Sequence, residues 1–297
     1  KPIIWHRFSS NFHGFTSAKM DQSELLNLLS DLPIGAVRYF DRVGSTNNQA
    51  AQWAKTGAPD LSLIVADEQT AGRGRFNRRW LTPPGGGIAF SLILQDQGRK
   101  STPSLEYITH FSGLGALAVC DALNEVLPVQ HNACIKWPND VLAGGGKIAG
   151  GLVEAQWDGD QLTTVILGIG INVASDSLPL LEELNFPATC VQNLLERPIN
   201  RWMLLHAVLG KLLYWRSFLG STEFIQAWES RLAYRGEWVQ IISLEKARVG
   251  DGQVLGLNEN GSLRLRARAG NVYSVSAGDI NLRPVDLLEK STKLVAK

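Results

Sequence analysis

Arginine and glycine residues concentrate in one short stretch, residues 70–80, which reads TAGRGRFNRRW. Gly72 and Gly74 allow backbone conformations and close approaches that other residues resist. The arginines offer planar donor groups that stay charged at neutral pH. They are Arg73, Arg75, Arg78 and Arg79. Such a loop is suited to a phosphate or a carboxylate, with a solvated basic turn as the alternative because short basic runs are common on surfaces.

A second group of polar residues lies in the segment 134–156, where Lys136, Asn139 and Asp140 surround a proline. Lys147 follows three consecutive glycines and precedes an apolar run. Polar side chains at strand ends around a tight hairpin are suited to a binding site. Taken alone, the same residues also fit an ordinary hairpin closed by an Asn-Asp turn.

Two further stretches combine strand and site features. Ser45 or Thr46 can begin a helix that runs through Ala54, which directs backbone N–H groups and hydroxyls out of a strand-to-helix turn. A plain helix cap is the alternative. Gly168 and Gly170 interrupt the apolar run 163–174, and glycine inside a strand marks a bulge or a close approach. We expect a ligand to lie across the sheet there.

The hydrophobic pattern predicts the elements that position these residues. Strands are expected at 37–43, 61–69, 88–94, 148–155 and 163–174, and helices at 21–32, 105–127, 200–219 and around Phe224 and Trp228. Beyond residue 236, short alternating runs are split by Asp-Gly and Asn-Gly turns, which indicates a small β-barrel or sandwich. We therefore divide the chain into a large domain, 1–235, and a small β domain, 236–297.

Bulk composition narrows the classes of function. A net charge of +1 over 297 residues gives no general attraction to nucleic acid. One helix before residue 45, without a second basic helix, predicts no DNA-binding helix-turn-helix domain. Three widely spaced cysteines argue against a disulfide framework or a zinc site, and no apolar run is long enough to cross a bilayer. We expect a cytoplasmic protein with no membrane contact.

The ordered motifs GSTN, QTAGRGR with RRW, KWPND, GKIAGGLVE and GIGINV closely resemble those of the biotin–protein ligase family. The likeness is strong over 37–173 and looser to residue 284. It implies an α+β fold, with a mixed β-sheet flanked by helices as in class II aminoacyl-tRNA synthetases and a C-terminal SH3-like β-barrel. The expected reaction joins biotin and ATP into biotinyl-5′-AMP and pyrophosphate, then transfers the biotinyl group to a lysine of a biotin carboxyl carrier domain.

The resemblance also assigns residues by motif position. The biotin-binding set is Ser45, Thr46, Gln69, Gly72, Arg73, Lys147, Gly150 and Gly168. The ATP or adenylate set is Arg75, Arg78, Trp80, Lys136, Asn139 and Asn172. Lys147, Arg75 and Asp140 are the expected catalytic residues, although Asp140 could instead brace the turn or a magnesium ion. Trp80 offers a face for adenine, with a core tryptophan as the alternative.

Cofactor and partner expectations follow from the same likeness. Mg²⁺ should accompany ATP, but no dedicated protein metal site is visible in the sequence. The likeness is to the monofunctional class without a DNA-binding domain, and it allows a homodimer. Phe76-Asn77 departs from the pattern, since many members have a glycine here. A lipoate or octanoate ligase of the same superfamily and a non-catalytic biotin or nucleotide sensor are the alternative functions.

Overall fold

The computed structural model describes residues 20–95, 105–179, 186–243, 248–276 and 280–284. The large sheet contains β1 (Val37–Val43), β2 (Ser62–Gln69), β3 (Gly87–Gln95), β4 (Cys134–Lys136), β5 (Asp140–Ala143), β6 (Gly146–Asp158) and β7 (Gln161–Asn172). Its strand order is β1-β2-β3-β7-β6-β5-β4. The β1–β2 pair is parallel and the other pairs are antiparallel, so the predicted mixed sheet is confirmed.

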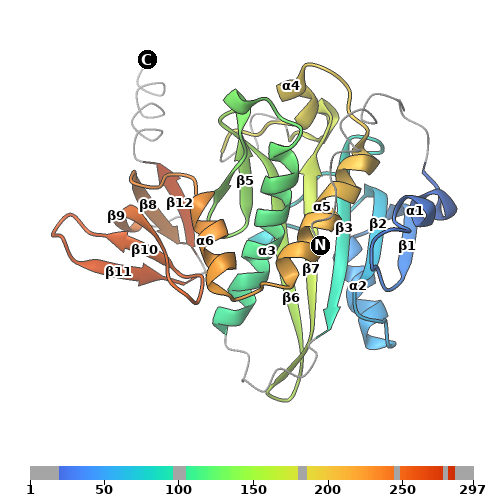
Figure 1. Cartoon of the computed structure of the whole chain (residues 1–297), viewed down its shortest axis with the longest axis horizontal. Coiled ribbons are helices and arrows are strands. Elements are labelled where there is room, and N and C mark those ends of the chain that lie inside the picture. Colours follow the sequence, from blue (N-terminus) through green and yellow to red (C-terminus); the bar gives the residue numbers. More distant parts are fainter. Residues whose placement is uncertain (1–19, 96–104, 180–185, 244–247, 277–279, 285–297) are drawn as a thin grey trace.

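Helices cover both faces of this sheet. The helices are α1 (Gln22–Leu28), α2 (Thr46–Lys55), α3 (Leu105–Asn124), α4 (Val191–Leu195), α5 (Arg201–Arg216) and α6 (Thr222–Ser230). Helices α3 and α5 pack on each other over one face (Figure 1). Helix α2 packs on β2, β3 and β7, where Ala50 meets Ile64 and Ile166. Within the described residues, no helix is long and apolar enough to span a bilayer.

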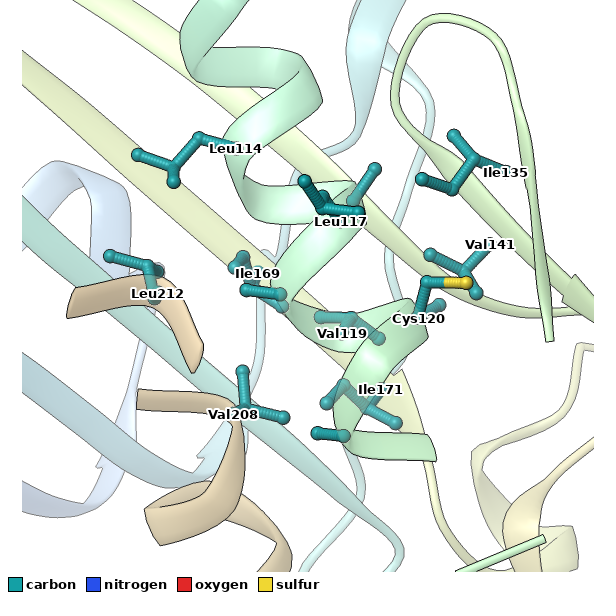
Figure 2. Packing of buried hydrophobic residues seen from close by; sticks show 14 of the residues in the cluster. Leu114, Leu117, Val119, Cys120, Ile135, Val141, Ile169, Ile171, Val208 and Leu212 are labelled. Carbon is teal, nitrogen blue, oxygen red and sulfur yellow. The ribbon is translucent and has the colours of Figure 1, made fainter. Parts of the chain in front are cut away.

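The main core lies between the sheet and α3 with α5. Figure 2 shows Leu117 and Cys120 of α3 close to Ile169 and Ile171 of β7, with Val208 of α5 in the same cluster. The Cys120 side chain is fully buried, and burial raises the pKa of its thiol. Cys120 therefore serves as a small buried apolar residue. Because side chains alternate along a strand, the even-numbered residues of β7 point to the opposite face, toward α2.

The second sheet begins at the predicted change of pattern. It contains β8 (Trp238–Ser243), β9 (Arg248–Leu257), β10 (Leu263–Arg266), β11 (Val272–Val275) and β12 (Ile280–Pro284). All its pairs are antiparallel, in the order β11-β10-β9-β8-β12. This small antiparallel sheet is consistent with the expected SH3-like domain. Trp137 Nε1 donates a hydrogen bond to Gly261 O at 2.9 Å, which joins the second sheet to the KWPND turn.

The first helix is shorter than predicted. Asp21 caps its start, and Glu24 completes a reciprocal capping box. The helix ends at Leu28 instead of continuing to Leu32. Pro33 accounts for the exclusion of Leu32 from the helix, because proline disfavours helical conformation in the residue before it. Leu32 still packs against the core from the following turn.

Candidate functional site

A cavity of about 200 Å³ lies on the α2 face of the large sheet. Arg73, from the loop 70–80, and Lys147, from the start of β6, both line it. All the other predicted site residues line it too, with the exception of Gly72. Gly72 instead supports the loop: its carbonyl accepts from Trp80 N at 2.9 Å, and a Cβ there would lie 2.4 Å from Trp80 O.

Glycines form the floor of the cavity. In the sheet register Gly150 of β6 pairs with Gly170 of β7, and Gly168 pairs with Ser91 of β3. A Cβ on Gly170 would lie 2.3 Å from the Trp80 ring. We expected a ligand to approach this strand directly, but in this structure the close approach to Gly170 is made by Trp80. The strand surface without side chains at Gly170 therefore packs against Trp80, which forms one wall of the cavity.

The start of α2 is held by a glutamine on the neighbouring strand. Gln69 Oε1 accepts from Thr46 N at 2.8 Å and from Thr46 Oγ1 at 3.1 Å. Ser45 occupies the N-cap position, yet its side chain makes no capping hydrogen bond. A plain helix cap therefore does not account for Ser45. Both residues are buried at the cavity, where their hydroxyls can meet a polar ligand.

The hairpin β4–β5–β6 supplies a charged pair. Lys147 Nζ lies 2.6 Å from Asp140 Oδ1. Burial raises the pKa of Asp140, but the positive charges of Lys147, Lys136 and Arg75 and the Lys147 hydrogen bond outweigh it, so the pKa lies below its ordinary value. Asp140 is therefore a carboxylate at neutral pH, which makes it a good hydrogen-bond acceptor and a weak base.

Lys136 and Asn139 also face the cavity from this hairpin. The Lys136 ammonium lies 4.6 Å from the ring centroid of Phe186, which also lines the cavity. Asn139 Oδ1 accepts from the Arg75 guanidinium at 2.9 Å. That hydrogen bond connects the Gly-Arg loop, residues 70–80, with the KWPND turn. Two motifs separated by more than 60 residues thus share one wall.

The middle of the Gly-Arg loop is strained. A short 3₁₀ turn, η3 (Arg75–Asn77), contains Phe76 at φ 61°, a left-handed conformation that bulky residues rarely adopt. The Arg75 guanidinium lies 4.7 Å from the Phe76 ring centroid and that of Arg78 lies 6.0 Å away. Arg78 is exposed at the cavity rim. The departure at Phe76-Asn77 therefore places an aromatic ring between two predicted nucleotide-binding arginines.

Trp80 and Asn172 complete the predicted set. Trp80 is half-buried, lines the cavity and has the Lys147 ammonium 5.4 Å from its ring centroid, so it is a wall residue. Asn172 Nδ2 donates to Thr189 O at 3.1 Å and lies 3.4 Å from Lys147 O. Its amide therefore holds the segment after 186 against Lys147, and its expected contact with the nucleotide stays a prediction.

Sequence reasoning missed a polar network beside the cavity. Asn47, Ser91 and Glu154 connect Thr46 to Arg73 through side-chain hydrogen bonds. Glu154 ends the GKIAGGLVE motif, and a charged residue inside an apolar strand was the available signal. Phe186 gave no signal, because it lies in no motif. Among the described residues, no group of three or more His, Cys, Asp or Glu could hold a metal ion.

Comparisons with known proteins identify relatives of this chain. Residues 39–172 match the model of the biotin/lipoate A/B protein ligase family. The bifunctional ligase/repressor BirA of Bacillus subtilis is 33% identical over 89% of this chain and 79% of that protein. The biotin–[acetyl-CoA-carboxylase] ligase of Paracoccus denitrificans is 33% identical over 77% of this chain and 93% of that protein.

Solved structures agree with the sequence relatives. The biotin protein ligase from Aquifex aeolicus, in complex with biotin and ATP, superposes with a TM-score of 0.70 at 28% identity. The match covers 84% of this chain and 99% of that one. The expected fold, a catalytic mixed sheet with a small second β domain, is therefore confirmed.

Proposed function

This chain belongs to the biotin/lipoate A/B protein ligase family, and we infer that it is an ATP-dependent biotin–protein ligase. It activates biotin with ATP and transfers the biotinyl group to a biotin carboxyl carrier domain, a reaction that the relatives' names and the complex with biotin and ATP support. One observation carries this conclusion. Arg73 and Lys147 line the same cavity above a glycine floor, so cations from a loop and from a separate strand converge where two anions must react.

In the first reaction a carboxylate oxygen of biotin attacks the α-phosphorus of ATP. A new P–O bond forms, the bond to the β-phosphate breaks, and pyrophosphate leaves. Since both reactants are negative, cations must offset their repulsion and the charge that develops in the transition state. We propose that Lys147 and Arg75 supply this charge. Lys147 is suited because its ammonium is held by Asp140 and faces the cavity.

In the second reaction the lysine amine of the carrier attacks the carbonyl carbon of biotinyl-5′-AMP. An amide bond forms, the C–O bond to the phosphate breaks, and AMP leaves with the nitrogen losing a proton. We propose that Asp140 orients the amine by accepting a hydrogen bond. Its lowered pKa supports this role over strong general-base catalysis, because a weak base removes a proton poorly.

The other predicted residues divide between the substrates. Thr46 and Gln69 offer the donors and acceptors that a ureido ring needs, and Ser45 and Arg73 lie beside them. We propose the opposite side of the cavity for the nucleotide, where Lys136, Asn139, Arg75, Arg78 and Trp80 lie. We also propose Asn172 for the nucleotide side, where its side-chain amide lies next to Lys147 O.

Mg²⁺ enters this proposal as part of the ATP substrate. The described residues hold no carboxylate cluster for it, and Asp140 is already paired with Lys147. We therefore derive no step through a protein-bound metal. The triphosphate oxygens supply the ligands that Mg²⁺ prefers.

The test is incubation of the protein with ATP, Mg²⁺, biotin and a carrier domain, followed by intact mass of the carrier. We expect a gain of one biotinyl group that depends on both ATP and biotin. A parallel reaction with lipoate distinguishes the related activity. Labelling with lipoate and none with biotin would overturn the biotin assignment, and no acyl transfer at all would favour the non-catalytic sensor.

Finer expectations on organisation and partners stay proposals. We propose a division near residue 235, supported by the start of the second sheet at Trp238. A cytoplasmic location fits the three free cysteines. We propose that the protein does not bind DNA, which a gel shift with duplex DNA tests. We also propose a homodimer as one option for the assembly, which sedimentation tests. Retarded DNA would contradict the absence of DNA binding. A monomer at all protein concentrations would contradict the homodimer.

A further inference from the structure

Glu154 is a carboxylate inside the central sheet that the proposed reaction does not use. It lies on β6, opposite Ile166 of β7, on the face that carries the cavity. Its side chain is 34% exposed, and its oxygens contact two different elements of the site. The neighbouring positions on this face of β6, Gly150 and Leu152, line the cavity, whereas Glu154 lies just outside it.

The first contact of Glu154 is with the Gly-Arg loop. Arg73 Nη2 lies 2.8 Å from Glu154 Oε2 and 2.9 Å from Oε1. The same nitrogen lies 2.8 Å from Asn48 Oδ1. The backbone on both sides of Arg73 is paired only within the loop, with Gly72 O accepting from Trp80 N and Gly74 N donating to Arg78 O, so these side-chain contacts set where the guanidinium lies. A charged hydrogen bond of this kind is also stronger than a neutral one.

The second contact is with the start of α2. Asn47 Nδ2 donates to Glu154 Oε2 at 2.7 Å, and Asn47 Oδ1 accepts from Ser91 Oγ at 2.6 Å. Asn47 is only 3% exposed, and its side-chain amide packs against Gly168. A Cβ on Gly168 would lie 2.0 Å from Asn47 Oδ1. The carboxamide is therefore clamped on three strands. The same Ser91 Oγ lies 2.8 Å from Thr46 Oγ1, so the network ends at a second cavity residue.

We propose that Glu154 is a positioning residue for biotin recognition, which holds Arg73 and Asn47 in one arrangement so that Arg73 and Thr46 face the ligand together. This inference rests on the proposed function. It adds a residue that touches neither substrate and acts through two that lie at the cavity. Because the nucleotide side of the cavity is anchored separately, through Arg75 with Asn139, the effect should be confined to biotin.

Glu154→Gln tests the charge with little change in shape. A glutamine cannot accept from Asn47 and Arg73 with both of its terminal atoms, since one of them is an NH₂ donor. We expect the Kd for biotin, measured by calorimetry, to rise about tenfold, and the KM for ATP in biotin-dependent pyrophosphate exchange to stay within about twofold. Glu154→Asp, which keeps the charge on a shorter side chain, should restore part of the loss.

Asp60→Asn is the matched control. Asp60 also connects two elements, because it accepts from the backbone N–H of Gln95 at 2.9 Å and from the Arg216 guanidinium at 2.7 Å. It precedes β2, at the end of that strand remote from Gln69. We expect it to lower the melting temperature without changing the Kd for biotin. A double-mutant cycle with Arg73→Gln adds a direct reading, because coupled residues give a double variant less impaired than the sum of the singles.

Three outcomes would overturn the inference. Unchanged biotin affinity in Glu154→Gln would mean that Arg73 and Asn47 hold their positions alone. Tighter biotin binding would mean that Glu154 competes with the ligand for Arg73. An equal change for biotin and ATP, in proportion to a lower melting temperature, would reduce Glu154 to a structural residue. If the unmodified protein does not bind biotin, the proposed function itself fails, which is a separate result.

Discussion

The two sources of positive charge at the cavity are built in different ways. Lys147 and Lys136 lie on strands of an antiparallel ladder, β4–β5–β6–β7, in which each strand is paired with its neighbour and a β-bulge separates Lys147 from Ala149. The Gly-Arg loop has one short 3₁₀ turn and one isolated bridge, Arg73 with Arg79. Backbone hydrogen bonds from Thr70 and Ala71 hold its start, whereas side chains join its middle to the rest of the site, Arg75 with Asn139 and Arg73 with Glu154.

This difference suggests a division of labour. A lysine that must lie at a fixed distance from a reacting carboxylate benefits from a rigid strand. Arginines that must surround a ligand after it has entered are better placed on a loop whose contacts can be exchanged. The comparison predicts that changes on the ladder alter chemistry or stability strongly, whereas changes on the loop have smaller and more local effects.

Lys147→Ala should give the largest effect. Removal of the ammonium takes away charge at the reacting groups, and we expect biotin-dependent pyrophosphate exchange to fall about a thousandfold. The matched loop variant, Arg78→Ala, removes an exposed cation from the rim and should cost far less. Exchange rates of the two variants, compared at saturating biotin and ATP, give the measurement. Equal losses would remove the proposed difference between ladder and loop.

Asp140→Asn tests the charged pair on the ladder through pH. The pKa of Asp140 is lowered from 3.8 on folding, so the pair stabilises the protein above that pH and the contribution is lost as the pH falls through the lower, folded value. At pH 7 the variant should lose about 2 kcal/mol of unfolding free energy, because Lys147 is left without its partner.

Urea unfolding at pH 7 and at pH 3 measures this effect. The difference between the unmodified protein and Asp140→Asn should narrow at the acidic pH, because below 3.8 the unfolded chain binds a proton that the folded carboxylate, with its lowered pKa, takes up less readily. Glu68→Gln, in an exposed pair with Arg42 at 3.3 Å, serves as a control with little expected change. If the difference in unfolding free energy between the unmodified protein and Asp140→Asn is the same at both pH values, the charge of the Asp140–Lys147 pair contributes nothing to stability.

Trp137→Phe tests whether the ladder side also depends on the second sheet. The indole is almost fully buried, and its N–H satisfies Gly261 O. Its neighbours Lys136 and Asn139 line the cavity. Loss of one hydrogen bond and an unsatisfied carbonyl should raise the KM for ATP about threefold, with biotin affinity unchanged. An unchanged KM for ATP would show that the KWPND turn keeps its shape without this hydrogen bond to the turn before β10.

The sequence predicted the ladder side of this comparison better than the loop side. Apolar runs located β6 and β7, with Gly168 and Gly170 inside the second, because buried strands leave a clear apolar run. They did not predict that Trp80 and Asn47 rest on those glycines, since a single sequence does not say which distant side chain fills a bare surface. The role of Glu154 was missed for the same reason: its partners are more than 80 residues away.

Phe76 gives the last and smallest prediction, on the loop side. Its left-handed backbone costs about 1 kcal/mol or more for a residue with a Cβ, and the ring regains part of this against Arg75. Phe76→Ala keeps the strain and loses the ring, whereas Phe76→Gly loses both. The glycine variant should therefore be more stable than the alanine variant by about 1 kcal/mol, measured by urea unfolding. If alanine is equally stable, the loop has relaxed to another conformation, and side-chain contacts alone do not fix it.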